Sequence, residues 1–278
     1  MRVSELNVYP LKGAAGIPLR SARLDAFGIE HDRRWMVTDP AGAFITQREA
    51  PSLARLTPVL EADALVLHSG TAGVLRLPLR PVRGAALPVR VWQDDVAALD
   101  TGDAAAAFIS AHIGAPARIV HMPDDRLRQV DRQYAREGDR VSFADAFPLL
   151  LIGDASLAEL ERRVGQPLGM RRFRPNIVAA VAVPHAEDAW QRITIGTVEC
   201  DVVKPCARCV VTTLDPDTGV AGREPLTTLA SYRRIGSKVF FGQNVIHRAM
   251  GTISVGDAIT VMSAGSPRPD LDTISATT

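Results

Sequence analysis

The first hundred residues alternate apolar and polar side chains over short stretches that are separated by turn residues. Stretches rich in branched and aromatic residues and bounded by Gly, Pro or Asp are typical of β-strands. Five such stretches occur here: VSELNVYPL, RWMVTD, ALVLHS, VLRLPL and PVRVWQD. The sequence SGTAG, between the third and the fourth, predicts a hairpin turn. We therefore expect β-structure throughout this part of the chain.

Two later segments have the pattern of helices instead. TGDAAAAFISAHIG offers Thr101 or Asp103 as its N-cap and Gly114 as its end. DASLAELERRVG offers Asp154 as its N-cap, repeats leucine and valine on one face, and ends at Gly165. The strand ARIVHM and an arginine-rich connection, DDRLRQVDRQYAREGDR, lie between the two helices, and the connection is expected to be partly helical or loop.

Strand patterns return after the second helix. They are RPNIVAAVAV, QRITIGTVECDVV, ARCVVTTL, VFFGQNVI and the pair in TISVGDAITVM. Many short strands with few helices predict a mainly β fold of the α+β class, a β-barrel with a few packed helices. We expect a smaller N-terminal β domain over residues 1–115 and a larger β-barrel domain over 116–263. Periodicity is lost from Ser263, so residues 264–278 are expected to be a flexible tail.

Composition narrows the class of protein. Of the 278 residues, 46% are hydrophobic and 23% charged, and the formal net charge is +1. This balance gives no reason to expect nucleic acid or an anionic membrane as a partner. The N-terminus lacks the apolar core of a signal peptide, and the most apolar run, FPLLLIG, is too short to span a bilayer. We expect a soluble, cytoplasmic protein that acts on small molecules.

The three cysteines all lie between Cys200 and Cys209. They therefore do not form a disulfide framework, and at least one thiol is expected to act at a single site. Cys206 and Cys209 have the spacing of half a zinc site, but a second close pair is missing. A redox dithiol would place its first cysteine at the start of a helix, whereas the β-branched residues after Cys209 predict a strand. Cys200 fits a buried position in a strand. Cys209, close to the tight turn DPDTG, fits a thiolate ligand of a soft metal.

Positive residues recur next to the predicted strands. MRRFRPNIV places Arg174 beside Asn176, and YPLKG, HDRRWMV and FITQREAP contribute Lys12, Arg33 and Arg48. Each alone is compatible with a solvated surface, but arginine is also the best side chain for bidentate contacts with phosphate. Because no glycine-rich phosphate loop is present, an anionic cofactor would be held by side chains from separate strands.

The motifs KPCARCVVTTLDPDTG, RFRPNIV, YPLKG and FGQN, in this order over nearly the whole chain, resemble the MOSC proteins that carry an N-terminal MOSC β-barrel domain. Within that family, the chain resembles amidoxime-reducing components and bacterial hydroxylaminopurine reductases. The resemblance implies a molybdenum cofactor, Mo-molybdopterin, with Cys209 as the protein ligand of the metal and Cys206 in a supporting or structural role.

The same resemblance implies roles for further residues. Lys12, Arg33, Arg174 and Asn176 correspond to cofactor contacts, with Thr46 and Arg48 as additional ones. Asp145, in FADAFP, corresponds to an acidic residue beside the metal and is the expected proton donor. Ala146 and Phe147 replace a pair of hydroxyl-bearing residues, so one set of expected hydrogen bonds to the pterin is either lost or moved to Asp145 and the backbone.

The activity that the resemblance implies is reduction of N-hydroxylated compounds, namely amidoximes, hydroxylamines and hydroxylaminopurines. A [2Fe–2S] cluster normally takes four cysteines and this sequence has three. The electrons are therefore expected from a separate ferredoxin, flavoprotein reductase or protein of the cytochrome b5 type. An alternative from another class is a cofactor carrier or a sulfur-transfer protein, similar to the C-terminal part of cofactor sulfurases, with a persulfide on Cys209.

Overall fold

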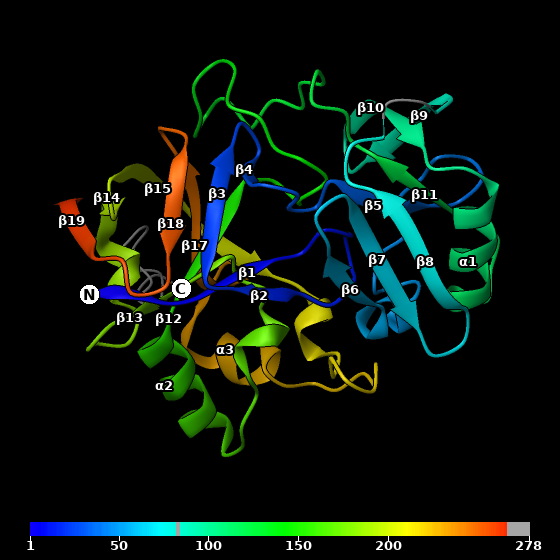
Figure 1. Ribbon diagram of the computed structural model, residues 1–278. Coiled ribbons are helices and arrows are strands. Elements are labelled where there is room, and N and C mark those ends of the chain that lie inside the picture. Colours follow the sequence, from blue (N-terminus) through cyan, green and yellow to red (C-terminus); the bar gives the residue numbers. More distant parts are fainter. Residues whose placement is uncertain (82–83, 266–278) are drawn as a thin grey trace.

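The computed structural model describes residues 1–81 and 84–265, and within them the fold is mainly β with a few packed helices, as predicted. A nine-stranded sheet dominates one lobe, on the left of Figure 1. All but one of its strands follow one path, and β16 (Arg234–Ile235) pairs with β17 beside it. In order, the path is β19 (Ile259–Ala264), β14 (Trp190–Ile195), β15 (Val198–Arg208), β17 (Lys238–His247), β12 (Leu149–Gly153), β13 (Ile177–Ala180), β1 (Arg2–Val8) and β2 (Ile17–Leu19).

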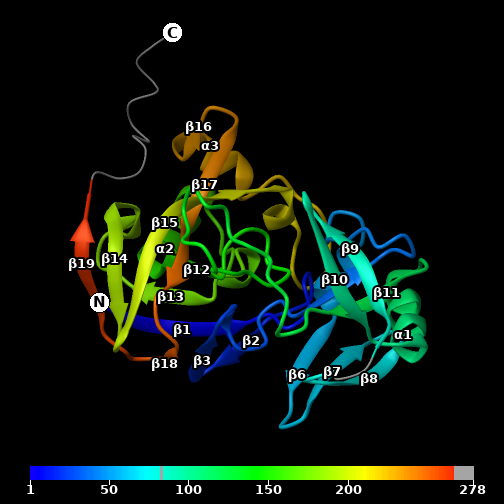
Figure 2. The same cartoon turned by 90° about the horizontal axis from the view of Figure 1, so that it is seen from above.

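The start of the chain is built into this lobe. β1 lies antiparallel to β13, with Leu6 opposite Ile177, and Figure 2 shows it running along the large sheet. A small sheet beside it joins β18 (Gly251–Ser254), β3 (Ser21–Asp25) and β4 (Gly28–Ile29). These pairings cross the predicted division at residue 115, which itself stays a prediction.

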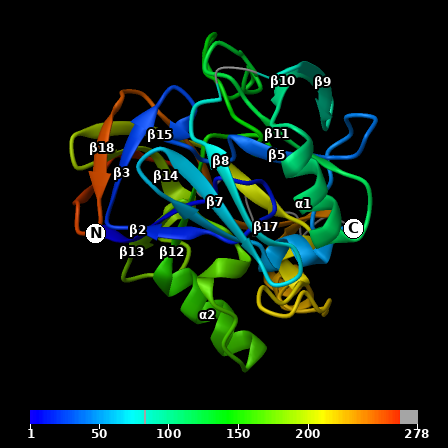
Figure 3. The same cartoon turned by 45° about the vertical axis from the view of Figure 1, so that its right-hand side comes forward.

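The second lobe, on the right of Figure 1, contains two smaller antiparallel sheets. One joins β5 (Trp35–Thr38), β11 (Arg118–His121), β10 (Asp94–Asp100) and β9 (Ala86–Val91), and the other joins β6 (Thr57–Leu60), β7 (Ala64–Ser69) and β8 (Gly73–Pro78). The turn predicted at SGTAG connects β7 to β8, with Ser69 opposite Gly73. Figure 3 shows α1 (Asp103–Ile113) at the outside of this lobe, where Phe108 and Ile109 enter the core.

Two further α-helices, α2 (Asp154–Val164) and α3 (Leu226–Tyr232), cover one face of the large sheet. Leu160 and Leu229 pack there against Ile152, Phe173 and Phe241. Short 3₁₀-helices complete the described regular structure: η1 (Pro51–Arg55), η2 (Met170–Arg172), η3 (Ala186–Ala189) and η4 (Val210–Thr213). None of the described helices is long and apolar enough to cross a membrane.

The helix ends at Gly114 and Gly165 are confirmed, since both residues adopt the left-handed conformation. The predicted N-caps are wrong, because Gly102 and Gly153 occupy those positions. The side chains of Thr101 and Asp154 make tertiary contacts, although the Asp154 carboxylate also accepts from the Ala155 amide at 2.7 Å. The Thr101 hydroxyl donates to the Ile119 carbonyl at 2.8 Å, and the Asp154 carboxylate accepts from the Val181 amide at 3.0 Å.

Two further predictions, for the connection between the first two α-helices and for the C-terminal end, can be compared with the structure. The arginine-rich connection between α1 and α2 folds as turns without a helix. β19 continues through Ala264, so periodicity is not lost at Ser263, and the expected tail beyond Gly265 lies outside the described residues.

Gly242, in the FGQN motif, has φ +80°, and a Cβ there would stand 2.6 Å from Ile152 and 2.9 Å from the Leu151 carbonyl. Only glycine allows β17 to approach β12 this closely.

Candidate active site

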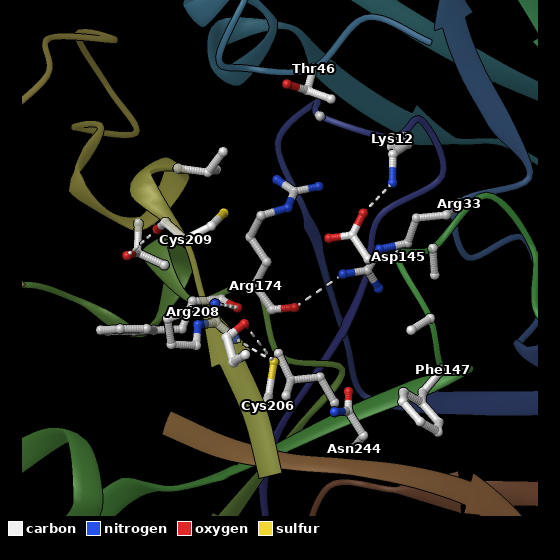
Figure 4. Close-up of a pocket in the computed structure, with 18 of the residues that line it drawn as sticks. Lys12, Arg33, Thr46, Asp145, Phe147, Arg174, Cys206, Arg208, Cys209 and Asn244 are labelled. Carbon is white, nitrogen blue, oxygen red and sulfur yellow. Dashed lines mark hydrogen bonds and ion pairs between the residues drawn. The ribbon is translucent and has the colours of Figure 1, made fainter. Parts of the chain in front are cut away.

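A pocket opens between the two lobes, with about 1010 Å³ of space free of protein atoms, including the solvent at its mouth. Its walls come from loops after β1, β5 and β9, from the segment before β12, and from the ends of η2 and β15. Figure 4 shows these segments converging from different parts of the chain. The pocket is lined by every site residue expected from the sequence: Lys12, Arg33, Thr46, Arg48, Asp145, Arg174, Asn176 and Cys209.

Cys209 lies directly after β15 and is the N-cap residue of η4. The expectation that ARCVVTTL continues as a strand is therefore wrong from Cys209 onward. The Thr212 hydroxyl and amide both donate to the Cys209 carbonyl, at 2.9 and 3.1 Å, and the Thr213 hydroxyl donates to the Val210 carbonyl at 2.8 Å. These bonds favour a tight helical turn over the extended backbone that β-branched residues otherwise prefer.

Arg48 connects the second lobe to this cysteine. A hydrogen bond to the Cys209 side chain raises the pKa of Arg48 above its ordinary value, against the opposing effect of burial. The Thr46 hydroxyl accepts from the Arg48 amide at 3.0 Å and donates to Glu49 at 2.5 Å. Thr46 thus shapes the turn that presents Arg48 to the thiol.

Arg33 and Asn176 tie the two halves of the pocket floor together. Arg33 Nη1 donates to Asp32 at 2.5 Å and to Asn176 Oδ1 at 3.1 Å, and Nη2 donates to the Arg174 carbonyl at 3.1 Å. Asn176 is buried, and its amide donates to the Asn7 carbonyl at 3.2 Å. Because Arg33 and Asn176 already form hydrogen bonds within the protein, they form a rigid floor of the pocket.

Arg174 is held differently. Its guanidinium donates to the Ala14 carbonyl at 2.5 Å and stands 4.4 Å from the Tyr9 ring centre. Burial and then the neighbouring Arg33 lower the pKa of Arg174 to about 10. The described residues offer this guanidinium no ion pair. Figure 4 shows it extending into the space between Cys209 and Lys12, where an anion would relieve the repulsion between the cations.

Lys12 and Asp145 form the ion pair on the opposite wall, with Nζ 2.5 Å from Oδ1. Lys12 also donates to the Phe143 carbonyl at 2.8 Å. The protein around Asp145 opposes its ionisation, but the Lys12 ammonium and hydrogen bonds from Lys12 and Trp92 outweigh this and hold the pKa of the carboxyl well below its usual range. Its side chain is 72% exposed, so solvent screens the pair. Asp145 is therefore ionised in the resting pocket.

Several lining residues were not identified from the sequence. Arg208 donates to the Cys206 sulfur at 3.1 Å and to the Phe173 carbonyl at 2.7 Å, which gives Cys206 a structural partner. The position of Arg208 next to Cys209 in the chain was the available signal. Trp92 and Asn244 also line the pocket. Asn244 belongs to the FGQN motif but was not singled out as a site residue, and no sequence pattern marked Trp92 as one.

The other arginines of MRRFRPNIV are used elsewhere. Arg172 donates to the Leu214 carbonyl at 2.7 Å and pairs with Asp215 at 3.1 Å, and Arg171 pairs with Asp217 at 3.0 Å. Together they hold the DPDTG turn, whose Gly219 is in the left-handed region as its position predicted. Arg172 also lines the pocket, but of these three arginines only Arg174 has no carboxylate partner among the described residues.

The donor set suits a phosphate-bearing cofactor with a soft metal better than it suits zinc. Among the described residues, no group of three or more His, Cys, Asp or Glu is arranged to hold a metal ion. Cys200 is fully buried in the core of the large sheet, as expected, and burial raises its pKa to about 12. The described pocket lining contains six Lys or Arg side chains against a single carboxylate. The Cys209 thiol in a cationic pocket fits a metal brought by an anionic cofactor, while the second thiol of the lining, Cys206, is bound by Arg208.

Comparisons with known proteins identify the family of the chain. The model of the MOSC N-terminal beta barrel domain matches residues 1–116, and that of the MOSC domain matches residues 138–260. The chain is 34% identical to human mitochondrial amidoxime-reducing component 1, over 94% of this chain and 82% of that protein, and 32% identical to the bovine component 2, over 94% and 83%. A Bordetella bronchiseptica solution structure matches at 32% identity over 33% of this chain and 73% of that one, with a TM-score of 0.30, too low to bear on the fold. The chain belongs to the MOSC-domain proteins with an MOSC N-terminal β-barrel domain and is related to the amidoxime-reducing components.

Proposed function

We propose that this protein is a molybdenum-cofactor-dependent reductase of N-hydroxylated compounds such as amidoximes, hydroxylamines and hydroxylaminopurines. The observation that carries the proposal is the partly exposed thiol of Cys209 at the edge of a pocket with an excess of positive charge. The other partly exposed thiol in this pocket, Cys206, accepts a hydrogen bond from Arg208. The relationship to proteins named amidoxime-reducing components supports the substrate class.

In this proposal Cys209 binds the molybdenum, and Arg174, Arg48 and Lys12 neutralise the cofactor's phosphate. Arg33 and Asn176, fixed by their protein contacts, orient the pterin, and Thr46 keeps the Arg48 turn in place. When bound, the cofactor supplies the two-electron chemistry that removes the hydroxyl oxygen of the substrate. Asp145, held by Lys12, accepts and returns a proton at its carboxylate as amine and water are formed.

The electrons are proposed to come from a separate donor protein of the ferredoxin, flavoprotein or cytochrome b5 type. Of the three cysteines in the sequence, one is buried in the core and two line the pocket, which supports an external donor. A cytoplasmic location also stays a proposal, which rests on the composition and the free thiols.

The test is metal analysis of protein produced in cells that make the cofactor. We expect stoichiometric molybdenum in the parent protein and its loss, by at least tenfold, in Cys209→Ser. Cys206→Ser is the matched control and should retain the metal. Zinc in the parent, or no metal, would contradict the proposal.

Dye-driven reduction of benzamidoxime then separates the two candidate classes. Turnover that disappears in Cys209→Ser supports the reductase. Stoichiometric molybdenum without turnover of any N-hydroxylated compound favours the cofactor carrier.

A further inference from the structure

Trp92 occupies an unusual place in the pocket wall. It lines the pocket and is 41% exposed, whereas Trp35 and Trp190 are 0% and 4% exposed. Large aromatic side chains normally bury most of their area, because burial contributes most of their stabilising effect. An exposed indole beside the candidate active site therefore calls for a reason beyond stability.

The backbone at Trp92 strengthens this argument. Val91 pairs with Asp94, so Trp92 and Gln93 form the two-residue turn of the hairpin between β9 and β10. Such turns favour Gly or Asn where a central residue takes positive φ. Trp92 has φ +56°, a conformation that bulky residues rarely adopt. The turn thus departs from its preferred residues at the one position that faces the pocket.

Three contacts hold the indole in place. Its Nε1 donates to Asp145 Oδ1 at 3.3 Å, the Phe44 ring packs edge-on with ring centres 5.0 Å apart, and the Arg48 guanidinium stands 5.2 Å from the indole centre. Arg48 in turn contacts the Cys209 side chain. The indole is therefore separated from the proposed metal ligand by a single planar guanidinium, and from Lys12 by a single carboxylate.

We propose that Trp92 is a specificity-determining residue, whose indole, together with Arg48, forms a flat platform that stacks the ring of planar heteroaromatic N-hydroxylated substrates. This inference rests on the proposed function and narrows it to a substrate class. Aromatic rings and guanidinium planes both stack on flat π-systems. A substrate whose hydroxylamino group reaches toward Cys209 places its ring over this platform, and an aliphatic amidoxime has no ring to place there.

The first test needs no turnover. With Trp35 and Trp190 buried, a ligand that stacks in the pocket quenches chiefly the fluorescence of Trp92. Adenine, the product of a hydroxylaminopurine, is expected to quench the emission saturably, and acetamidine, the product of an aliphatic amidoxime, to leave it unchanged. Trp92→Phe should abolish the adenine effect, and Val183→Ala, an exposed apolar residue outside the pocket lining, should preserve it.

Performing the titration on cofactor-free and cofactor-loaded protein separates two possible stacking partners. Quenching by adenine in both forms supports a substrate platform. Quenching only in the cofactor-free form means that Trp92 stacks on the cofactor itself, and would overturn the inference.

The second test compares 6-hydroxylaminopurine with acetamidoxime in the loaded enzyme. Trp92→Asn suits the left-handed turn and so should fold at least as well as the parent protein. We expect the ratio of kcat/KM for the purine to that for acetamidoxime to fall about tenfold, through KM of the purine, and Trp92→Phe to restore most of it.

Equal losses with both substrates would assign Trp92 to support of Asp145 or of the cofactor and overturn the inference. Failure of the proposed function gives a different result, because the parent protein then reduces neither substrate.

Discussion

At the scale of single residues, the pocket is defined by how its charges are paired. Arg33 and Lys12 each pair with a carboxylate, Asp32 and Asp145, at 2.5 Å. Arg174 has a backbone carbonyl and an aromatic face as its partners, and its pKa is lowered by burial and by Arg33. A buried cation without a carboxylate partner is stabilised most when an anion binds beside it. Arg174 is therefore the side chain whose charge should matter most for cofactor retention.

Arg174→Asn is expected to weaken cofactor binding by about 10- to 100-fold, the effect of losing one or two hydrogen bonds to a charged group. Asparagine tolerates the left-handed backbone at this position, where φ is +56°. Because a poorly paired cation is removed, the cofactor-free variant should unfold within about 1 kcal/mol of the parent. Cofactor content after dialysis and thermal unfolding check both points.

Arg171→Asn serves as the control for this prediction. Arg171 is an exposed arginine that pairs with Asp217 outside the pocket, so cofactor content should be unaffected. Equal cofactor loss in the two variants would contradict a specific role for Arg174.

At the scale of elements, the short helix η4 decides where the Cys209 thiol sits. β15 ends at Arg208, and η4 turns the chain within one residue. Thr212 and Thr213 are both nearly fully buried and both donate to a carbonyl three residues earlier, but only Thr212 donates to Cys209. The two threonines are therefore a natural matched pair.

Thr212→Val and Thr213→Val should each reduce the free energy of unfolding by about 1 kcal/mol, since each removes one buried hydrogen bond. Only Thr212→Val should also lower the molybdenum retained after dialysis, because it removes one of the two hydrogen bonds that hold the carbonyl of the proposed ligand. Urea unfolding and metal analysis provide the two readouts. Similar metal loss in both variants would mean that η4 acts only through overall stability.

At the scale of the whole molecule, function depends on the junction between the lobes. Arg33 and Asn176 are 143 residues apart in sequence, and Lys12 and Asp145 are 133 apart, yet each pair is in direct contact. His121, on β11 at this junction, is 5% exposed and its ring centre lies 4.8 Å from that of Trp35. Burial and then Arg34 lower the pKa of His121 to about 3.

This histidine predicts acid sensitivity of the fold. Its ordinary pKa is about 6.5, so between pH 6.5 and 3 the unfolded chain binds the proton and the folded protein does not. Stability is therefore lost as pH falls through this window. From pH 7 to pH 5 the contribution is roughly 2 kcal/mol. Urea unfolding at the two pH values should show this loss, and His121→Gln should reduce it by about that amount; an unchanged pH dependence in the variant would refute the assignment.

Local patterns in the sequence determined much of the fold. Alternation located the strands, and the glycines at 114 and 165 ended the helices as expected, because hydrophobic period and left-handed backbone are short-range properties. The burial of Cys200 followed from the same alternation. The family motifs named residues that all line one pocket, which no local rule would have grouped.

Tertiary structure alone decided the rest. Thr101 and Asp154 contact the distant Ile119 carbonyl and Val181 amide. Residues 210–213 form a helical turn through hydrogen bonds between residues three apart, which strand propensity does not anticipate. Trp92 reaches the pocket only because a strained turn is held by Asp145, Phe44 and Arg48. The partners of Thr101, Asp154 and Trp92 in these contacts lie far apart along the chain, so no short window of sequence contains both members of a pair.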